Sequence, residues 1–366
     1  MLRIYDTRTR QVEEIAPARG LRMYACAPPV HRRAHLGDLR QALLSDLIRR
    51  VLERHRVRMV VCRAGDDAGH PAQESEAFAR DAAALNLRPP EQSPRAADHA
   101  DQLLGLIARL VEQGHAHVAD GRVVFDAATS PSYGELSGGD SPDGPDSPDG
   151  PDGAAGWELW RPADGEAAWD SPWGRGLPGP DVACSALALR LLGERIDILT
   201  GGAELISPHH EAVRAQADAV TGHEVVRHWV HGAGLLAEGG EPPELSAVTD
   251  DGIDPLAVRL AFLEHHYRRP LDLSPAALRA ADATVRRWRA RVAEWSESPS
   301  APMAAAHVER AESALDDDLD TPAALRVLAE LEQDASVPPG AKFESFVHLD
   351  QVLALDLPAD IGRPRP

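Results

Sequence analysis

The chain has 366 residues, of which 43% are apolar and 26% charged, and its formal net charge is −20. This composition is typical of a soluble globular protein of two or three domains, and no apolar run is long enough to cross a membrane. The acidic balance argues against a surface built for a polyanion, because neutralised phosphates supply most nucleic-acid affinity. We therefore expect small-molecule substrates, no nucleic-acid partner, no membrane association and a monomer.

The cysteine and lysine content also bears on the chemistry. Three cysteines cannot all form disulfides, and no basic, apolar signal segment opens the chain, so a reducing cytoplasm is expected. A cysteine site would then serve metal binding or catalysis. The basic residues are arginines except for one lysine, Lys342.

The N-terminal part is predicted to form strands around one helix. Residues 2–5 and 12–15 read as a short strand pair, and residues 21–26 as a core strand that ends in Cys26. A helix follows from His35, and residues 57–62 complete a parallel strand, helix, strand unit. Phosphates and nucleotides usually bind in the crevice at such a helix start. Gly37 there would let a flat base or sugar approach the backbone closely.

The middle of the chain is less regular. Helical spacing covers residues 75–87 and 96–113, and a hairpin strand is expected at residues 118–126. Residues 137–156 repeat SPDGPD and are predicted to form a disordered acidic loop. The tryptophan-rich segment 157–180 reads as irregular, and its rings either pack a loop onto a domain face or form a ligand lid.

The second half returns to alternating elements and ends in helices. Residues 181–192 read as a helix that carries Cys184, and residues 196–199 as a strand before Gly201 and Gly202. Another helix begins near Ser207 and a strand covers residues 227–230. Helical spacing then recurs at residues 255–263, 276–292, 304–315 and 322–331.

Three dispersed residues are expected to converge at one edge of the sheet. Cys26 follows the first core strand, Cys184 lies near a helix start, and His209 begins a helix after a later strand. Two thiolates and an imidazole suit zinc, and three protein ligands leave a fourth position for a substrate atom. The same residues also occur in packing and helix-end roles, so spacing alone leaves both interpretations open.

A series of motifs in fixed order resembles one family. The motifs are YAC at 24–26, HLGD at 35–38 in place of HIGH, SPWGRGLPG at 171–179, CSALAL from Cys184, GGAEL at 201–205, PHHE at 208–211, DGIDPLAVRL at 251–260 and ALDDDLDTPAAL at 314–325. With them the chain resembles the cysteinyl-tRNA synthetase superfamily of class I synthetases. Within that superfamily it is most similar to the mycothiol cysteine ligases, which join cysteine to glucosaminyl-inositol at the expense of ATP.

The resemblance implies an α/β fold with a Rossmann-type parallel sheet and a C-terminal all-helical domain. The catalytic domain would span residues 1–235, with a connective insert at about 85–175; a degenerate KMSKS-loop region would span 236–254 and the helical domain 255–366. The implied cofactors are zinc and ATP with Mg²⁺, with zinc receiving the thiolate of the substrate cysteine.

The resemblance also assigns roles to individual residues. Zinc would be held by Cys26, Cys184 and His209. His35, Gly37 and Asp38 would serve catalysis and ATP binding, together with Gly201, Gly202 and Glu204 for ATP. The substrate would contact Cys26, Ala27, Pro180 and His210.

The chain departs from the synthetase pattern around the amino acid. Val213 stands where synthetases place a fourth zinc ligand, as in the mycothiol ligases, which favours three protein ligands. Pro180 and Ala183 replace the Trp and Glu of the synthetase motif GWHxECS.

The larger departures lie where the triphosphate should bind. Asp38 replaces the second His of HIGH and would place a negative charge at the helix start. The segment after Gly234 reads LLAEGGEPPELSAVTDDGI and holds no lysine, although the KMSKS lysines neutralise charge during adenylate formation. Arg32, Arg33 and Arg63 are candidates to replace them.

Three functions are therefore compatible with the sequence. The first is an ATP-dependent ligase that activates cysteine, or a similar thiol amino acid, as an adenylate and transfers it to an amine such as glucosaminyl-inositol. The second is a catalytically impaired paralogue that keeps the fold and zinc site for binding or regulation. A true tRNA synthetase is the least favoured, because the surface is acidic and the helical tail is short.

Overall fold

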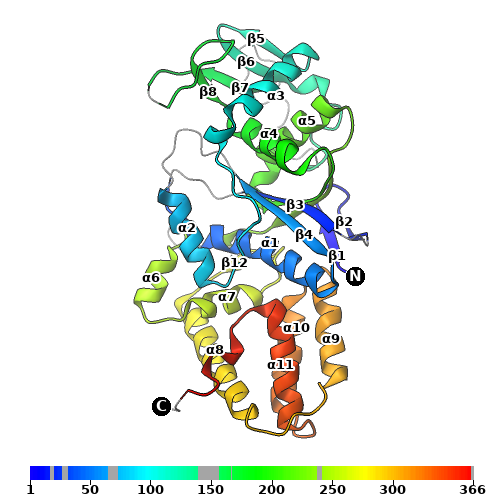
Figure 1. Cartoon of the computed structure of the whole chain (residues 1–366), viewed down its shortest axis with the longest axis vertical. Helices are drawn as coiled ribbons and strands as arrows, with labels where there is room; N and C mark the ends of the chain where they lie inside the picture. Colours follow the sequence, from blue (N-terminus) through cyan, green and yellow to red (C-terminus); the bar gives the residue numbers. More distant parts are fainter. Residues whose placement is uncertain are drawn as a thin grey trace.

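The computed structural model describes residues 1–16, 20–26, 32–64, 73–138, 156–165, 167–236 and 241–363, and the side chains of residues 73 and 74 are not included. Ala27 and most of the predicted acidic loop lie outside these residues. Figure 1 shows an α/β body with the central sheet at mid-height, a smaller sheet with helices above it and a bundle of helices below it. None of the described helices is long and apolar enough to cross a membrane.

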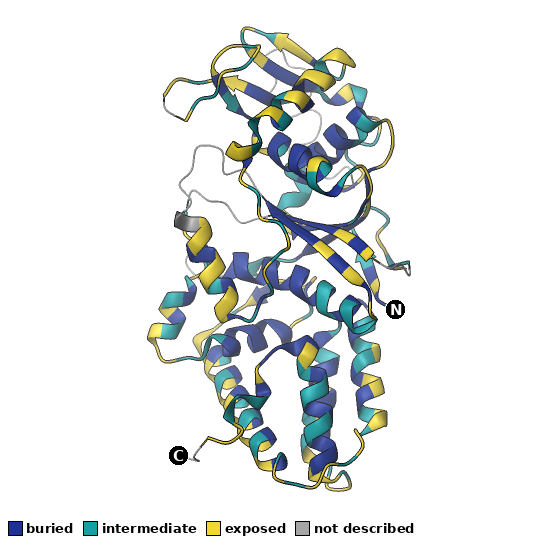
Figure 2. Cartoon of the chain, in the orientation of Figure 1, coloured by how far each residue is buried: buried dark blue, intermediate teal, exposed yellow. Residues whose placement is uncertain are grey.

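The central sheet has four parallel strands in the order β10 (Val226–Gly232), β9 (Ile196–Gly202), β3 (Gly20–Cys26) and β4 (Arg58–Ala64). The predicted parallel sheet is therefore confirmed. The strands are rich in buried apolar residues because helices cover the sheet. Figure 2 shows the burial concentrated in these strands and in the helix faces that meet them.

Helix α1 (Leu36–Arg54) follows β3 and packs on the sheet through apolar residues at helical spacing, among them Leu39, Leu43 and Val51. On another side of the helix, Asp46 accepts a hydrogen bond of 2.8 Å from Arg259 of α7 (Pro255–Leu263), and both side chains are completely buried. Removing one partner of such a pair costs roughly 3–5 kcal/mol, so this contact fixes the helical domain to the sheet domain.

The insert contains a second sheet, and one prediction about it was wrong. Its antiparallel strands are β5 (Ala116–Ala119), β6 (Arg122–Asp126), β7 (Gly156–Pro162) and β8 (Gly176–Pro178). The tryptophan-rich segment therefore includes two strands rather than being irregular throughout. Trp160 is completely buried, and Trp157 stacks on Phe125 at 4.5 Å between ring centroids. Pairing with β6 outweighs the Gly and Pro residues that flank the strands.

The remaining elements frame these sheets. They are β1 (Arg3–Asp6), β2 (Gln11–Glu14), α2 (Gln73–Ala84), α3 (Ala100–Glu112), α4 (Pro180–Leu192), η4 (Ile206–His210), α5 (Glu211–Thr221), β11 (Leu235–Leu236), α6 (Leu245–Asp250), β12 (Leu271–Asp272), α8 (Pro275–Trp295), α9 (Ala305–Asp316), α10 (Thr321–Gln333) and α11 (Pro339–Leu353). The predicted helices of the C-terminal part are all present. Sequence analysis missed α11 and the short α6.

Candidate active site

The sheet edge brings Cys26 and two histidines together. Cys26 is the last residue of β3, and His209 and His210 lie in η4, directly before α5. The Cys26 Sγ lies 3.0 Å from the Nε2 of His210 and 3.9 Å from the Nε2 of His209. The donor atoms of all three lie within 4.8 Å of one another, which makes this a group able to hold a metal ion.

Cys184 of α4 joins the same cluster and is 1% exposed. A hydrogen bond with Cys26, supported by the nearby His209 imidazole, lowers the pKa of the Cys184 thiol well below its usual value. The same hydrogen bond, with burial, raises the pKa of Cys26. Cys184 therefore adjoins Cys26 and His209, while the group whose donor atoms all lie within 4.8 Å of one another is Cys26, His209 and His210.

Asp181, in the first turn of α4, orients His209. Its Oδ1 lies 2.5 Å from the Nδ1 of His209, so the other ring nitrogen faces the cysteine sulfurs. Burial opposes a charge on His209, but Cys184 and Asp181 outweigh it and raise the pKa of the imidazole. A carboxylate on the far nitrogen of a ligating histidine fixes its tautomer and orientation in zinc sites. Sequence analysis missed this role of Asp181.

The donor set fits zinc. Thiolate and imidazole donors are those that zinc prefers, and the Asp181 contact supplies the outer support that such a site requires. Val213 is a buried apolar residue on α5 and offers no donor atom. His210, assigned to substrate from sequence, contacts Cys26 directly and lies close enough to be a further donor.

Behind His210 runs a chain of buried polar contacts that the sequence did not reveal. The Nδ1 of His210 lies 2.7 Å from the Nε2 of His231, whose Nδ1 lies 2.7 Å from the Thr7 hydroxyl. Burial lowers the pKa of His210 and brings that of His231 to about 3, so both rings are neutral. Gly201 makes room for this arrangement, because a Cβ there would lie 2.6 Å from the His210 Cε1.

The end of the site where phosphates were expected to bind, here called the phosphate end, lies at the start of α1 and differs from the expectation. His35 is the N-cap of α1, and a capping box joins it to Asp38: the Asp38 Oδ2 accepts from the His35 N–H at 2.8 Å, and the His35 Nδ1 accepts from the Asp38 N–H at 3.2 Å. A Cβ on Gly37 would lie 2.9 Å from the His35 Cε1. The His35 ring therefore covers the face of Gly37 that we expected to admit a base or sugar.

Asp38 does not present an uncompensated charge, contrary to the expectation from sequence. It is 5% exposed and accepts two hydrogen bonds from Arg32, at 2.6 Å and 3.1 Å. Its charge is thus neutralised within the protein and used to close the first turn of α1. The sequence position was predicted correctly, but the effect of the carboxylate depends on Arg32, which lies outside the HLGD motif.

The described part of the KMSKS-loop region contacts the same helix start. The Pro243 carbonyl accepts a hydrogen bond of 2.9 Å from the Leu36 N–H. Glu241 lies 3.5 Å from the Nε of Arg32, and Glu244 lies 3.3 Å from the Nε of Arg33. Two of the arginines proposed to replace the missing lysines are therefore paired with acidic residues. The third, Arg63, is buried, with Nη2 3.4 Å from the Ser45 hydroxyl.

The other predicted ATP and substrate residues are dispersed. Glu204 is exposed and accepts a hydrogen bond from Gln41 of α1, in the space that a side chain on Gly202 would occupy. Pro180 is exposed at the first position of α4. This places Gly202 and Glu204 between β9 and α1, near the phosphate end, and Pro180 one residue before Asp181.

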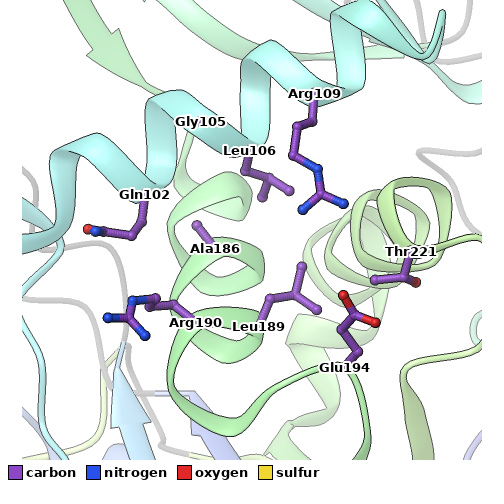
Figure 3. A pocket seen from close by; sticks show the side chains of 9 residues that line it. All are labelled: Gln102, Gly105, Leu106, Arg109, Ala186, Leu189, Arg190, Glu194 and Thr221. Atoms are coloured by element: carbon purple, nitrogen blue, oxygen red, sulfur yellow. The ribbon is translucent and has the colours of Figure 1, made fainter.

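A separate cavity lies between α3, α4 and α5, and none of the predicted site residues lines it (Figure 3). Its volume is about 260 Å³, and its lining includes the charged residues Arg109, Arg190 and Glu194 and the apolar residues Leu106 and Leu189. Helix α4 contributes to both sites, Cys184 to the metal-binding cluster and Arg190 to this cavity.

Comparison with known proteins agrees with this geometry. The family model of the class I tRNA synthetase (C) catalytic domain matches residues 12–283. The chain belongs to this family. A cysteine–tRNA ligase of Opitutus terrae is 35% identical over 89% of this chain and 80% of its own length. The enzyme of the same name from Methylocella silvestris is 36% identical over 99% of this chain and 86% of its own length.

Solved structures support the fold. Methionyl-tRNA synthetase of Mycobacterium tuberculosis, bound to methionyl-adenylate, superposes with a TM-score of 0.60 at 15% identity, over 92% of this chain and 90% of that chain. A leucyl-tRNA synthetase of Agrobacterium radiobacter K84 gives a TM-score of 0.65 at 10% identity, over 94% and 84% of the two chains. The chain is thus an ATP-dependent ligase of the aminoacyl-tRNA synthetase type, and the family implies ATP with Mg²⁺.

Proposed function

We propose that this ligase activates cysteine, or a similar thiol amino acid, as an adenylate, with zinc on Cys26, Cys184 and His209 as the receptor of its thiolate. The observation that carries the proposal is the meeting of these three side chains, with Asp181 on the far nitrogen of His209. Zinc bound there supplies a direct ligand position for sulfur. An alcohol is a much poorer ligand, so serine is rejected.

Two buried histidines form one wall of the cluster. His210 and His231 are neutral because burial lowers the pKa of each. They therefore hold the wall of the site by hydrogen bonds without adding a positive charge that would repel the substrate ammonium. Thr7 completes the chain and fixes the orientation of the His231 ring.

The acceptor that we propose is an amine such as glucosaminyl-inositol. Support comes from Val213, which as in the mycothiol ligases cannot supply the ligand that synthetases place at this position, and from the net charge of −20, which disfavours a polyanionic acceptor. The curated relatives are named for tRNA, so tRNA is the competing acceptor. A cavity of about 460 Å³, lined by three arginines together with Glu264 and Asp320, is the structural feature that favours it.

A catalytically impaired paralogue is the second candidate, and a specific observation favours it. Arg32 and Arg33, which could stabilise the transferring phosphates, are paired with Asp38, Glu241 and Glu244. Adenylate formation requires positive charge where pyrophosphate leaves. In an active enzyme that charge would come from Mg²⁺ bound with ATP, or from the two arginines after they leave their acidic partners.

A product assay with two acceptors tests these proposals. Purified protein is incubated with ATP, Mg²⁺ and cysteine, together with either glucosaminyl-inositol or cysteine-specific tRNA, and the products are identified by mass spectrometry. We expect AMP and a cysteinyl amide of the amino sugar, both absent from the Cys26→Ser variant. Cysteinyl-tRNA instead of the amide would assign the tRNA acceptor. No product with either acceptor, from protein that retains zinc, would favour the impaired paralogue.

A further inference from the structure

A second group of metal-binding side chains lies outside the synthetase site, where the N-terminal hairpin meets the sheet. Asp6 ends β1, Glu13 lies on β2 and His228 lies on β10, the strand at one end of the central sheet order. β1 contacts β10, and the Thr7 N–H donates to the Trp229 carbonyl at 2.8 Å. In Figure 1 the hairpin lies beside the central strands near the N-terminus.

The donor atoms of this group face one another. The His228 Nδ1 lies 3.5 Å from the Asp6 Oδ2 and 3.6 Å from the Glu13 Oε2, and all three atoms fall within 4.8 Å. These separations exceed the N–H···O hydrogen-bond range of about 2.7–3.2 Å. A tetrahedral zinc with bonds of about 2.0–2.2 Å holds its ligand atoms roughly 3.3–3.6 Å apart. The two separations that involve His228 fall in this range, and the two carboxylate oxygens lie within 4.8 Å of each other.

Each carboxylate is anchored through its other oxygen. The Asp6 Oδ1 accepts from the Arg8 N–H at 2.7 Å, and the Glu13 Oε1 accepts from the Thr9 hydroxyl at 2.6 Å. The tight turn between β1 and β2 thereby fixes both carboxylates with one oxygen directed toward His228. Support of this kind orients the ligands of metal sites.

Asp6 and His228 are buried, and their facing atoms lack hydrogen-bond partners. Asp6 is 0% exposed and His228 is 2% exposed. Within the part of the chain that the structure describes, the Asp6 Oδ2 and both ring nitrogens of His228 have no hydrogen-bond partner. Most buried polar side-chain atoms in proteins are hydrogen-bonded, and each exception calls for a missing ligand or a strained geometry. A bound ion would satisfy the Asp6 oxygen and one ring nitrogen together.

The side chains of this group carry an excess of negative charge, which favours a bound cation. The guanidinium of Arg8 is itself paired with Glu224 and donates to the Arg227 carbonyl. Asp6 and Glu13 therefore direct two negative charges at one imidazole, and a dication would neutralise both.

We propose that Asp6, Glu13 and His228 bind a divalent transition-metal ion, with Zn²⁺ as the probe, at a site separate from the Cys26 cluster. His228 and His231 are three residues apart on β10 and so project from opposite faces of the strand. Glu13 has 34% side-chain exposure, which gives water access to a fourth ligand position. The ion would tie the β1–β2 hairpin to the sheet.

Metal analysis of the full chain in matched variants tests this site. After equilibration with Zn²⁺ and removal of free metal, we expect about two zinc ions per wild-type chain, about one in Cys26→Ser and in Glu13→Gln, and almost none in the double variant. Glu14→Gln, which alters the exposed neighbour of Glu13, serves as the control and should equal wild type. His228→Gln should match Glu13→Gln.

Cobalt substitution identifies the donors. Co²⁺ in the wild type should show a thiolate charge-transfer band from the Cys26 site, and Cys26→Ser should lose that band but keep the visible d–d bands of the second site. Those bands should disappear when Glu13→Gln is added. If Glu13→Gln and His228→Gln bind as much metal as Glu14→Gln, the group is an ion pair of a protonated His228 with two carboxylates, and the proposal is overturned.

Discussion

The two ends of the candidate active site differ in how their polar side chains are paired. At the sulfur end, the donor atoms of Cys26, His209 and His210 lie within 4.8 Å of one another, next to Cys184. At the phosphate end, Arg32 and Asp38 are bonded to each other rather than presented to a ligand. One end therefore keeps free donors for a ligand, while the other satisfies its charges internally.

The comparison shows that a motif can keep its place in the fold while its side chains take a different chemical role. HLGD occupies the place of HIGH and begins the helix in the expected register, yet its carboxylate closes a capping box. The segment that replaces KMSKS also reaches the helix start, where Pro243 accepts from the Leu36 N–H. The helix start and the segment expected to frame the phosphates therefore lie together, and the nearby Arg32 and Arg33 are paired with acidic residues.

The largest effect is expected from removing a sulfur. Cys184→Ser should lose most of the zinc bound at the sulfur end and lower cysteine activation by more than about 100-fold, because loss of a ligand exceeds the 10- to 100-fold cost of losing outer support. Zinc content and turnover measure this. Cys62→Ala is the matched control: burial raises the pKa of Cys62 to about 12, so it stays a core thiol and its loss should spare the zinc. Equal zinc in both variants would contradict the assignment.

A smaller effect is expected at Asp181. Asp181→Asn keeps an oxygen for the His209 Nδ1–H but removes the charge, so zinc affinity should fall by about 10- to 100-fold. Competition with a chelator of known affinity measures the change. Asp164→Asn, at an exposed position of the insert, controls for net charge and should bind as the wild type. An unchanged affinity in Asp181→Asn would mean that His209 is not a ligand.

The phosphate end should respond to Asp38 in two separable ways. Asp38→Ala removes the capping box and should destabilise the fold by about 1 kcal/mol, measured by urea denaturation. Asp38→Asn keeps a capping oxygen but frees Arg32, so calorimetric titration should show tighter ATP binding than wild type. Adding Arg32→Gln to Asp38→Asn should abolish that gain. Equal ATP affinity in wild type and Asp38→Asn would show that the pair lies away from the nucleotide.

The smallest effect is expected from the acidic segment. Glu241→Gln with Glu244→Gln removes one acidic partner each from Arg32 and Arg33, in partially exposed ion pairs worth about 0.2–1 kcal/mol each. ATP binding should tighten by roughly two- to fivefold per ion pair removed. The pair Glu14→Gln and Glu309→Gln changes the net charge equally at exposed, distant positions and is the control. An equal increase in ATP affinity in the two double variants would show that the effect comes from net charge alone.

Sequence patterns predicted the features that depend on residue spacing and on the order of strands and helices. The strand, helix, strand unit around α1 follows from apolar spacing, and the meeting of Cys26, Cys184 and His209 follows from the rule that parallel strands share a carboxyl edge. The strands β7 and β8 were missed because pairing with β6 supplies what their Gly- and Pro-rich flanks do not indicate.

The remaining site residues depend on contacts that spacing does not encode. Thr7 reaches His231 only because the N-terminal hairpin packs on β10, and Asp181 acts through a histidine 28 positions later. Asp38 was assigned an unfavourable charge because its partner Arg32 lies before the motif, in a segment without periodicity. Sequence analysis therefore proposed the cluster and its donors, and the structure shows which residues contact them.

The most direct test of the account is amino-acid-dependent exchange of pyrophosphate into ATP. The assay is run on wild type and on Cys26→Ser with each amino acid and Mg²⁺. We expect exchange with cysteine, little or none with serine, and loss of exchange in Cys26→Ser, because the thiolate receptor at the sulfur end selects the substrate. Zinc-loaded wild-type protein that catalyses no exchange with any amino acid, with or without the amino-sugar acceptor, would contradict cysteine activation.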